Sequence, residues 1–216
     1  MGGGRGYGST HSQNLEKFIL GIPGLKLYVA HNRTDMARFY RVLLECIEMP
    51  SIVIENKLLY GTSPTDPLLD GYRLTESTHT FPITRVMSNN PVDITVLVFG
   101  RMGREVEGAA QMLKEEEIEL DIFYPVHIDA LEIVHTLQES LQVTRRLLIV
   151  EEGSATLGLG TEIMARYSEC FGERNSCIMR HLAAAERPIP AARYLEEQTL
   201  PGRCDIYDTL LELFDA

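Results

Sequence analysis

The sequence predicts an α/β protein in which strands and helices alternate along the chain. Residues 146–163 (RLLIVEEGSATLGLGTEI) carry the clearest sign, because a short apolar run leads through a glycine-containing loop into a helical pattern. Residues 93–99 (DITVLVF) form a second continuous apolar run, as expected of a parallel strand that is buried on both faces. Residues 25–55 show the order strand, helix, strand. An open, mostly parallel sheet with flanking helices accounts for all three stretches.

The first of these units lies in residues 25–55. Residues 25–30 (LKLYVA) and 51–55 (SIVIE) predict two strands, and residues 34–48 predict the helix between them. Apolar residues recur in that helix at spacings of three and four, which places them on one face. They are Met36, Phe39, Tyr40, Leu43, Leu44 and Ile47. Pro50 ends the helix, because proline cannot continue it.

Residues 62–91 differ in composition from the rest of the chain. They hold Pro64, Pro67, Pro82 and Pro91, together with Gly71 and several Ser and Thr residues. Such a segment is typical of a loop or linker that lies along the surface of its neighbours. We therefore expect a first unit over residues 1–61, a linker over residues 62–91 and a second domain over residues 92–216.

The second domain continues the alternation of strands and helices. Asp129 is a plausible N-cap, because it precedes a helical pattern with a side-chain oxygen able to accept from free N–H groups. The strands predicted here span residues 93–99, 118–124, 146–150 and 176–182. The predicted helices cover residues 106–113, 130–141, 161–171 and 205–214.

Composition excludes several classes of function. The chain of 216 residues has a formal net charge of −11, which disfavours a nucleic-acid surface and an anionic membrane as partners. No apolar run approaches the roughly 18 residues that a membrane span needs. Residues 1–13 lack the apolar core of a signal peptide, and the four cysteines show no CxxC spacing. We expect a cytoplasmic protein with reduced thiols and no metal site.

Three features are candidates for chemistry. Gly158-x-Gly160 lacks the third glycine of a dinucleotide loop, since position 163 is Ile163, so close packing of the helix on the sheet explains it better. Glu151 and Glu152 follow a strand end and either act as acid and base or, more commonly, cap a helix or meet an interface.

His11 is the third candidate, and it follows a glycine-rich stretch. That stretch either wraps a ligand or is a disordered start. His11 correspondingly either meets the ligand, as an imidazole that titrates near neutral pH, or is a solvent-exposed terminal histidine.

Five blocks of the sequence together resemble one protein family, the beta subunits of thiamine-diphosphate-dependent 2-oxo acid dehydrogenases in the transketolase-like superfamily. The blocks occur in the family's order and span nearly the whole chain. They are GGGRGYGSTHSQNLEKFILGIPGLKLYVA, SIVIENKLLYG, ITVLVFGRMGREVEGAAQML, RRLLIVEEGSATLGLGTEI and PIPAARYLEEQTLP. The resemblance does not identify a substrate.

The resemblance implies a division of labour between domains and subunits. Residues 1–61 would be part of a pyrimidine-binding domain, and residues 92–216 a transketolase C-terminal-like domain that serves assembly. An alpha-type subunit with a GDG motif would hold the diphosphate and magnesium, in line with the absence of that motif here. Thiamine diphosphate and magnesium would therefore bind only in complex with partner subunits. The resemblance also implies that His11 lies near the cofactor and handles substrate or acceptor.

The sequence departs from the family in its first domain. Relatives carry about a hundred more residues before the glycine-rich loop, including the glutamate that activates the cofactor. We expect a truncated strand-helix-strand fragment whose sheet is unpaired on one side. A second polypeptide supplies the missing half, or this half packs on something else, or the protein is a remnant. The turn at residues 46–50 is shorter than the family's cation-binding loop, so we predict no ion there.

Two functions remain open from the sequence. In the first, the chain is the C-terminal section of a split beta-type subunit, inactive alone, that contributes to decarboxylation and acyl or ketol transfer with partner chains. His11 would be its catalytic acid–base residue, and the C-terminal domain would be a candidate surface for self-association. In the second, the chain is a non-catalytic interaction or regulatory module that keeps the family's assembly surface.

Overall fold

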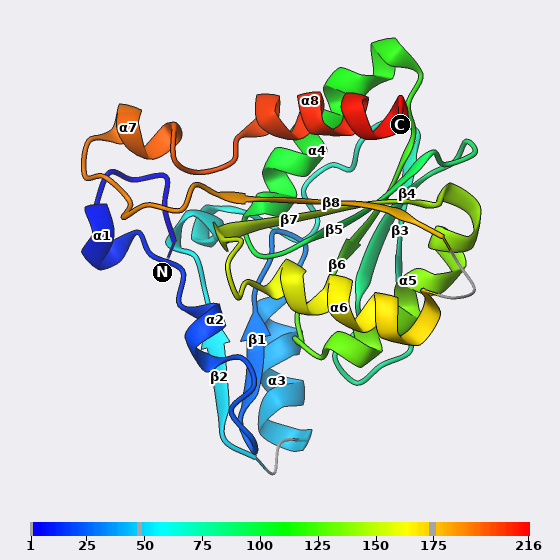
Figure 1. Cartoon of the computed structure of the whole chain (residues 1–216). Helices are drawn as coiled ribbons and strands as arrows, with labels where there is room; N and C mark the ends of the chain where they lie inside the picture. Colours follow the sequence, from blue (N-terminus) through cyan, green and yellow to red (C-terminus); the bar gives the residue numbers. More distant parts are fainter. Residues whose placement is uncertain (1, 47–48, 173–175) are drawn as a thin grey trace.

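A six-stranded sheet lies at the centre of the protein, as seen in a computed structural model that describes residues 2–46, 49–172 and 176–216 (Figure 1). The strand order is β3-β4-β6-β5-β7-β8. The strands are β3 (Tyr72–Glu76), β4 (Thr84–Ser88), β5 (Ile94–Val98), β6 (Leu120–Tyr124), β7 (Arg146–Ser154) and β8 (Ile178–Ala184). Strands β6, β5, β7 and β8 run parallel to one another, whereas β4 pairs antiparallel with both β3 and β6. The expected open, mostly parallel sheet is confirmed.

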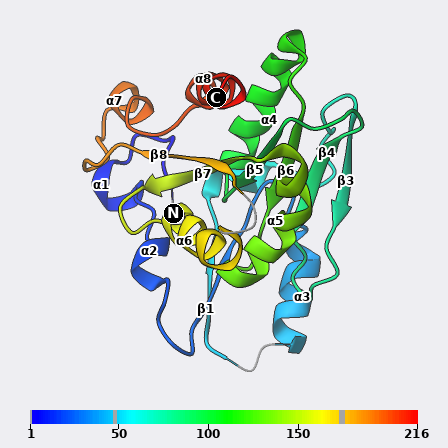
Figure 2. The ribbon, with the colours of Figure 1, turned by 45° about the vertical axis from the view of Figure 1, so that its right-hand side comes forward.

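Helices cover both faces of this sheet, which makes three layers (Figures 1 and 2). One face carries α4 (Met102–Met112) and α8 (Arg203–Phe214), and the other carries α5 (Ala130–Thr144) and α6 (Leu159–Phe171). Strand β5 shows why a continuous apolar run was needed. Its Val96 and Val98 side chains belong to the core under α4 and α8, while Leu97 belongs to the core under α5 and α6.

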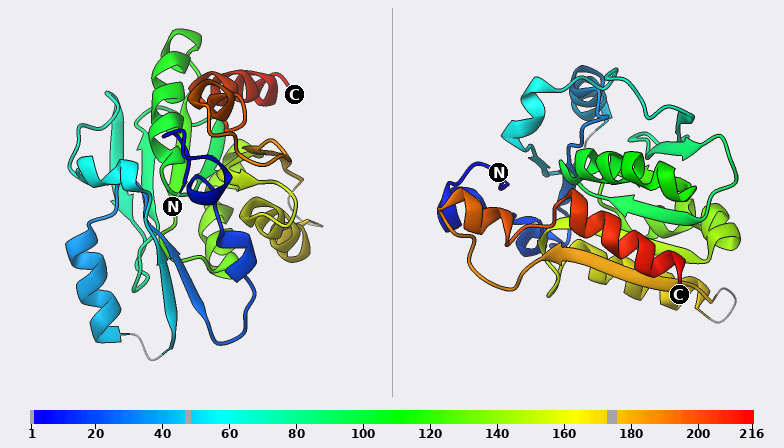
Figure 3. Two further views of the ribbon diagram at one scale, coloured as in Figure 1. Left: turned by 90° about the vertical axis from the view of Figure 1, so that its left-hand side faces the viewer. Right: turned by 90° about the horizontal axis from the view of Figure 1, so that it is seen from above.

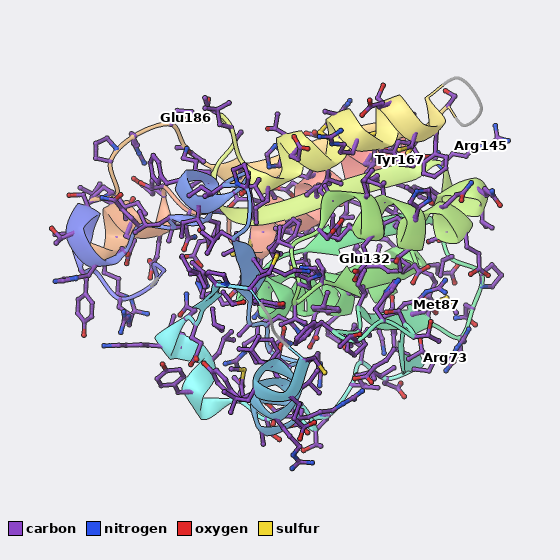
Figure 4. The ribbon with its side chains drawn as sticks, turned by 90° about the horizontal axis from the view of Figure 1, so that it is seen from below. Arg73, Met87, Glu132, Arg145, Tyr167 and Glu186 are labelled. Atoms are coloured by element: carbon purple, nitrogen blue, oxygen red, sulfur yellow. The ribbon has the colours of Figure 1, made fainter. Side chains whose placement is uncertain are left out.

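Local signals set the ends of several elements. Asp129 caps α5 as expected, because its Oδ1 accepts from the N–H groups of Leu131 and Glu132 at 3.0 and 3.1 Å. Arg145 follows α5 in a left-handed conformation, with φ of 52°, and turns the chain into β7 at the end of the helix (Figure 4). Helix α4 continues into a 3-10 turn, η2 (Leu113–Glu116).

The segment 62–91 is the main departure from expectation, because it contains β3 and β4 rather than only loop. Strand β4 lies between β3 and β6 and alternates buried and half-buried residues from Thr84 to Ser88, the pattern of a strand that is fully buried on one face only. Arg73 and Met87 lie side by side on this hairpin, where the two strands pair (Figure 4). The prolines and Gly71 that suggested a linker bound the strands instead of interrupting them.

A second, smaller sheet is formed by β1 (Lys26–Val29) and β2 (Ser51–Ile54), which run parallel with α3 (Met36–Cys46) between them. The expected strand-helix-strand unit is confirmed over the described residues; positions 47 and 48 of the expected helix lie outside them. The second edge of β1 bonds to the chain after β6, since Val29 N donates to Val126 O and Ile128 N donates to Leu27 O. Strand β1 therefore lies between β2 and the larger domain.

A buried ion pair fastens the small sheet to α4. Arg33, which follows β1, donates from Nε and Nη2 to the two carboxylate oxygens of Glu107 at 3.0 and 2.7 Å. Asn32 Nδ2 and Tyr124 Oη both donate to Glu107 Oε1 at 2.9 Å. The guanidinium also donates to the carbonyl of Asp66 at 2.5 Å. One carboxylate thus joins the small sheet, the large sheet and α4.

The first residues of the chain return to its last third. Four short elements take part: α1 (Gly8–His11), α2 (Glu16–Ile19), the 3-10 helix η1 (Lys57–Gly61) and α7 (Arg193–Glu197). Figure 3 shows α1 beside α7, far from it in the sequence, and Figure 1 agrees. In the described ranges, no helix combines the length and apolar character that crossing a bilayer requires.

The Arg33–Glu107 pair yields a stability prediction. Glu107→Ala leaves a buried guanidinium without its carboxylate, so we expect the free energy of unfolding to fall by about 3–5 kcal/mol in urea titrations. The matched control is Glu197→Ala, which removes the exposed Glu197–Arg193 pair and should leave the unfolding curve nearly unchanged. Equal effects of the two substitutions would contradict this account.

Candidate functional site

The glycine-rich start of the chain packs against two buried carboxylates. Gly3 N donates to Glu152 Oε1, and Gly6 N donates to Glu196 Oε2 at 2.5 Å. Gly8 has φ of 68° and its Cβ, if present, would lie 3.2 Å from Ala191 Cβ. A side chain at that position would therefore be both strained and crowded. The segment is held in place by the end of β7 and by α7.

His11 ends α1 and is exposed. It lines an open pocket of about 710 Å³. The other lining residues are Arg5, Tyr7, Ser9, Thr10, Gln13, Leu15 and Lys57. This set holds two permanent cations, three hydroxyl-bearing side chains and no carboxylate, in a chain whose net charge is −11. The pocket is thus suited to an anionic ligand beside an imidazole.

The same pocket does not complete a thiamine diphosphate site by itself. No carboxylate lines it that could serve the aminopyrimidine, and among the described residues no group of three His, Cys, Asp or Glu side chains could hold a metal ion. The cations and hydroxyls that line the pocket can hold an anionic group.

Glu151 caps α6 and does not face the His11 pocket. Its oxygens accept from Gly160 N at 2.9 Å and Leu159 N at 3.3 Å, and His181 Nε2 lies 2.7 Å from Oε1. A Cβ on Gly160 would lie 2.5 Å from the His181 ring, and one on Gly158 would lie 2.5 Å from the Glu151 carboxylate. Helix capping and close packing therefore explain Glu151 and both glycines.

Glu152, which accepts from the glycine-rich segment, also belongs to a second group of charged side chains. Its Oε2 lies 2.5 Å from Arg101 Nε. Glu16 from α2 and Glu151 line the same small cavity. Burial raises the pKa of the Glu16 carboxyl to about 7, and the neighbouring Glu152 and Glu151 carboxylates add to the rise. Lys17, next to Glu16, donates to Ser154 Oγ at 2.5 Å and so fixes α2 to the end of β7.

Sequence reasoning found His11 but missed Arg5, Lys57, Glu16 and Glu196. Arg5 and Lys57 both lie inside sequence blocks that resemble the family, GGGRGYG and VIENKLLYG, yet neither has a local pattern that predicts a site. They meet only because η1 is folded back on the glycine segment. Glu196 lies in the block PIPAARYLEEQTLP, but no spacing predicts its role, because its partner Gly6 lies 190 residues away.

The Glu16 carboxyl gives the protein a predicted pH dependence. Its pKa rises from 4.5 to about 7 on folding, so the folded state holds a proton that the unfolded chain has lost. Stability should therefore fall as pH rises through that window and level off above it. Glu16→Gln removes this titration, and we expect it to gain stability over the natural protein across the window. Urea midpoints measured against pH test this, and a gain that does not change with pH would contradict it.

Comparisons with known proteins place this geometry in a family. The profile of the family described as "Transketolase, C-terminal domain" matches residues 86–206, more than half of the chain. A solved structure described as "Split gene transketolase, inactive beta4 tetramer" superposes with a TM-score of 0.62 at 18% identity. The match covers 96% of this chain and 63% of that one, and it supports the fold.

Curated relatives match almost the whole chain. The pyruvate dehydrogenase E1 component subunit beta of Porphyra purpurea is 27% identical, and the match covers 100% of this chain and 62% of the relative. The mitochondrial pyruvate dehydrogenase E1 component subunit beta-1 of Arabidopsis thaliana is 30% identical, and the match covers 95% of this chain and 55% of the relative. The acetoin:2,6-dichlorophenolindophenol oxidoreductase subunit beta of Bacillus subtilis strain 168 is 26% identical, and the match covers 95% of this chain and 57% of the relative.

The chain thus spans between about half and three-fifths of the length of these relatives. These relatives are named as beta subunits, and their similarity to this chain confirms the resemblance that the sequence blocks indicated. The family profile matches residues 86–206 and the sheet has the corresponding fold, so the chain belongs to the transketolase C-terminal domain family.

Proposed function

We propose that this chain is the C-terminal section of a split transketolase or 2-oxo acid dehydrogenase beta-type subunit. With partner chains it contributes to thiamine-diphosphate-dependent decarboxylation and acyl or ketol transfer. The observation that carries this proposal is the pocket that joins His11 to Arg5 and Lys57 without any lining carboxylate. Relatives named as beta subunits of pyruvate dehydrogenase and acetoin oxidoreductase support it.

The pocket residues divide the work by their chemistry. The Arg5 guanidinium offers a planar pair of donors to a carboxylate, and the Lys57 ammonium adds a point charge. Together they orient an anionic substrate such as a 2-oxo acid. The His11 imidazole then donates a proton to, or accepts one from, the substrate oxygen where charge changes. Each role belongs to a side chain that lines the same pocket.

The remaining parts of the enzyme are assigned to partners. An alpha-type subunit would hold the diphosphate and magnesium, and a further chain would supply the rest of the pyrimidine-binding domain, of which residues 1–61 are one part. Residues 92–216 would serve assembly, including self-association. The proposed location is the cytoplasm, whereas the Arabidopsis thaliana relative is named as mitochondrial.

His11→Ala tests the proposed catalytic role. In a mixture of this chain, an alpha-type subunit and the pyrimidine-domain partner, we expect 2-oxo acid turnover to fall about a hundredfold or more. The matched control is His79→Ala, since His79 is a partly exposed histidine that lines a different pocket. An inactive mixture with the natural chain, or an unchanged rate in the His11 variant, would refute the enzyme role.

The cations of the pocket give an independent prediction. Lys57→Ala and Arg5→Ala should raise KM for an anionic substrate more than they lower kcat. The two cationic side chains bind the substrate equally in the ground state and in the transition state. Lys114→Ala is the control, since its ammonium lies 3.5 Å from Asp70, outside the pocket. If kcat alone falls in the two pocket variants, the binding role is wrong.

A further inference from the structure

A second pocket opens where the small sheet meets the larger domain. It has a volume of about 570 Å³ and shares no lining residue with the His11 pocket. Its walls come from the start of β1, from the connection between β3 and β4, and from the segment that leads into α5. They include Lys26, Tyr28, Thr80, Phe81, His127 and Glu132. The roles proposed for the His11 pocket therefore leave this pocket unexplained.

The hydroxyl group of Tyr28 is a buried donor without an acceptor. Tyr28 is 0% exposed, and its Oη makes no hydrogen bond with the described residues. Its ring is held in place, because the ring centroid lies 4.7 Å from that of Phe81 and 5.0 Å from that of His127. Burial, with a smaller contribution from the Glu132 carboxylate, raises the pKa of Tyr28 to about 12, so the hydroxyl keeps its proton. A fixed, buried hydroxyl without a partner points to a bound group that completes it.

An acceptor that lacks a hydrogen bond borders the same pocket. Glu132 lies in the first turn of α5 (Figure 4), and its buried Oε1 makes no hydrogen bond with the described residues. This oxygen lies 3.5 Å from His79 Nδ1, but Ser77 Oγ already contacts that nitrogen at 2.9 Å, and one ring nitrogen serves one hydrogen bond. The other oxygen, Oε2, lies 3.6 Å from His127 Nδ1. Glu132 Oε1 is therefore still able to accept from a ligand.

The charges of the pocket favour a neutral ligand. Among the described residues that line it, Lys26 is the one permanent cation and Glu132 is the one carboxylate. A negatively charged ligand would be repelled by Glu132, and a positively charged one by Lys26. The His11 pocket differs, because it has two permanent cations and no carboxylate. A hydroxyl group suits both polar partners here, since it can accept from the Tyr28 hydroxyl and donate to Glu132 Oε1.

We infer that this pocket binds a small, neutral, polyhydroxylated ligand such as a monosaccharide. One hydroxyl of the ligand bridges Tyr28 Oη and Glu132 Oε1, and the exposed Thr80 offers a further polar contact nearer the solvent. The rings of Phe81 and His127 give the carbon skeleton an apolar wall. The volume lies in the range of small-molecule sites, about 300–1,000 Å³. The inference does not rest on the proposed function, because the two pockets have separate walls.

Nuclear magnetic resonance of the full, 15N-labelled chain tests the site with D-glucose as the probe. Amide shifts should saturate as glucose is added, and they should centre on residues 26–28, 78–81 and 127–132. D-glucuronate and D-glucosamine keep the sugar ring and each add one charge, so both should bind more weakly than glucose. A pocket that holds only water would give no saturable shifts, and that result would overturn the inference. So would shifts confined to the His11 pocket, or tighter binding of either charged sugar.

Tyr28→Phe tests the bridging contact, because it removes one oxygen and keeps the ring. We expect the Kd for D-glucose to rise about fivefold, as for the loss of one hydrogen bond. The matched control is Tyr194→Phe, since Tyr194 is an exposed tyrosine on α7 that does not line the pocket, and its Kd should stay unchanged. An unchanged Kd in Tyr28→Phe, or equal rises in the two variants, would contradict the bridging role.

Urea unfolding without glucose separates a binding defect from a folding defect. Tyr28→Phe should be at least as stable as the natural chain, because the hydroxyl that it removes has no partner there. A clear loss of stability would mean that the Tyr28 hydroxyl is satisfied within the chain, and the inference would then be wrong. Added D-glucose should stabilise the natural chain more than the variant, since a ligand stabilises the folded state that binds it.

Discussion

Two buried carboxylates, Glu152 and Glu196, fix the glycine-rich segment on which the candidate site depends. A buried carboxylate requires hydrogen-bond donors, and each of these accepts from a backbone N–H of that segment. Glycine is needed there because the chain passes close to Ala191 with positive φ. The His11 pocket therefore exists only when the ends of the chain, about 190 residues apart, are folded together.

The small sheet depends on the larger domain in a similar way. Strand β1 has one neighbour in β2 and another in the chain after β6, and the buried Arg33 pairs with Glu107 of α4. A parallel pair of four-residue strands has little stability alone, so these tertiary contacts hold it. The side of β2 away from β1 has no comparable support within the described residues.

Much of the sheet could be predicted from sequence because its strands are buried on both faces. Continuous apolar runs such as residues 93–99 leave few alternatives, and Asp129 caps its helix through contacts only two and three residues away. Strands β3 and β4 were missed because β3 buries only its first residue and β4 buries only alternate residues, and prolines and Gly71 surround that weak pattern. For Glu151, the helix cap that the sequence favoured is present.

The sequence by itself determined the fold class, the family resemblance and the presence of His11 behind a glycine-rich loop. These depend on local periodicity, on turn chemistry and on blocks of residues that are close in the chain. Only the tertiary structure decided which cations join His11, which carboxylates hold the glycines and which edge of β2 stays open. Those features arise where distant segments meet, and no spacing along the chain encodes such meetings.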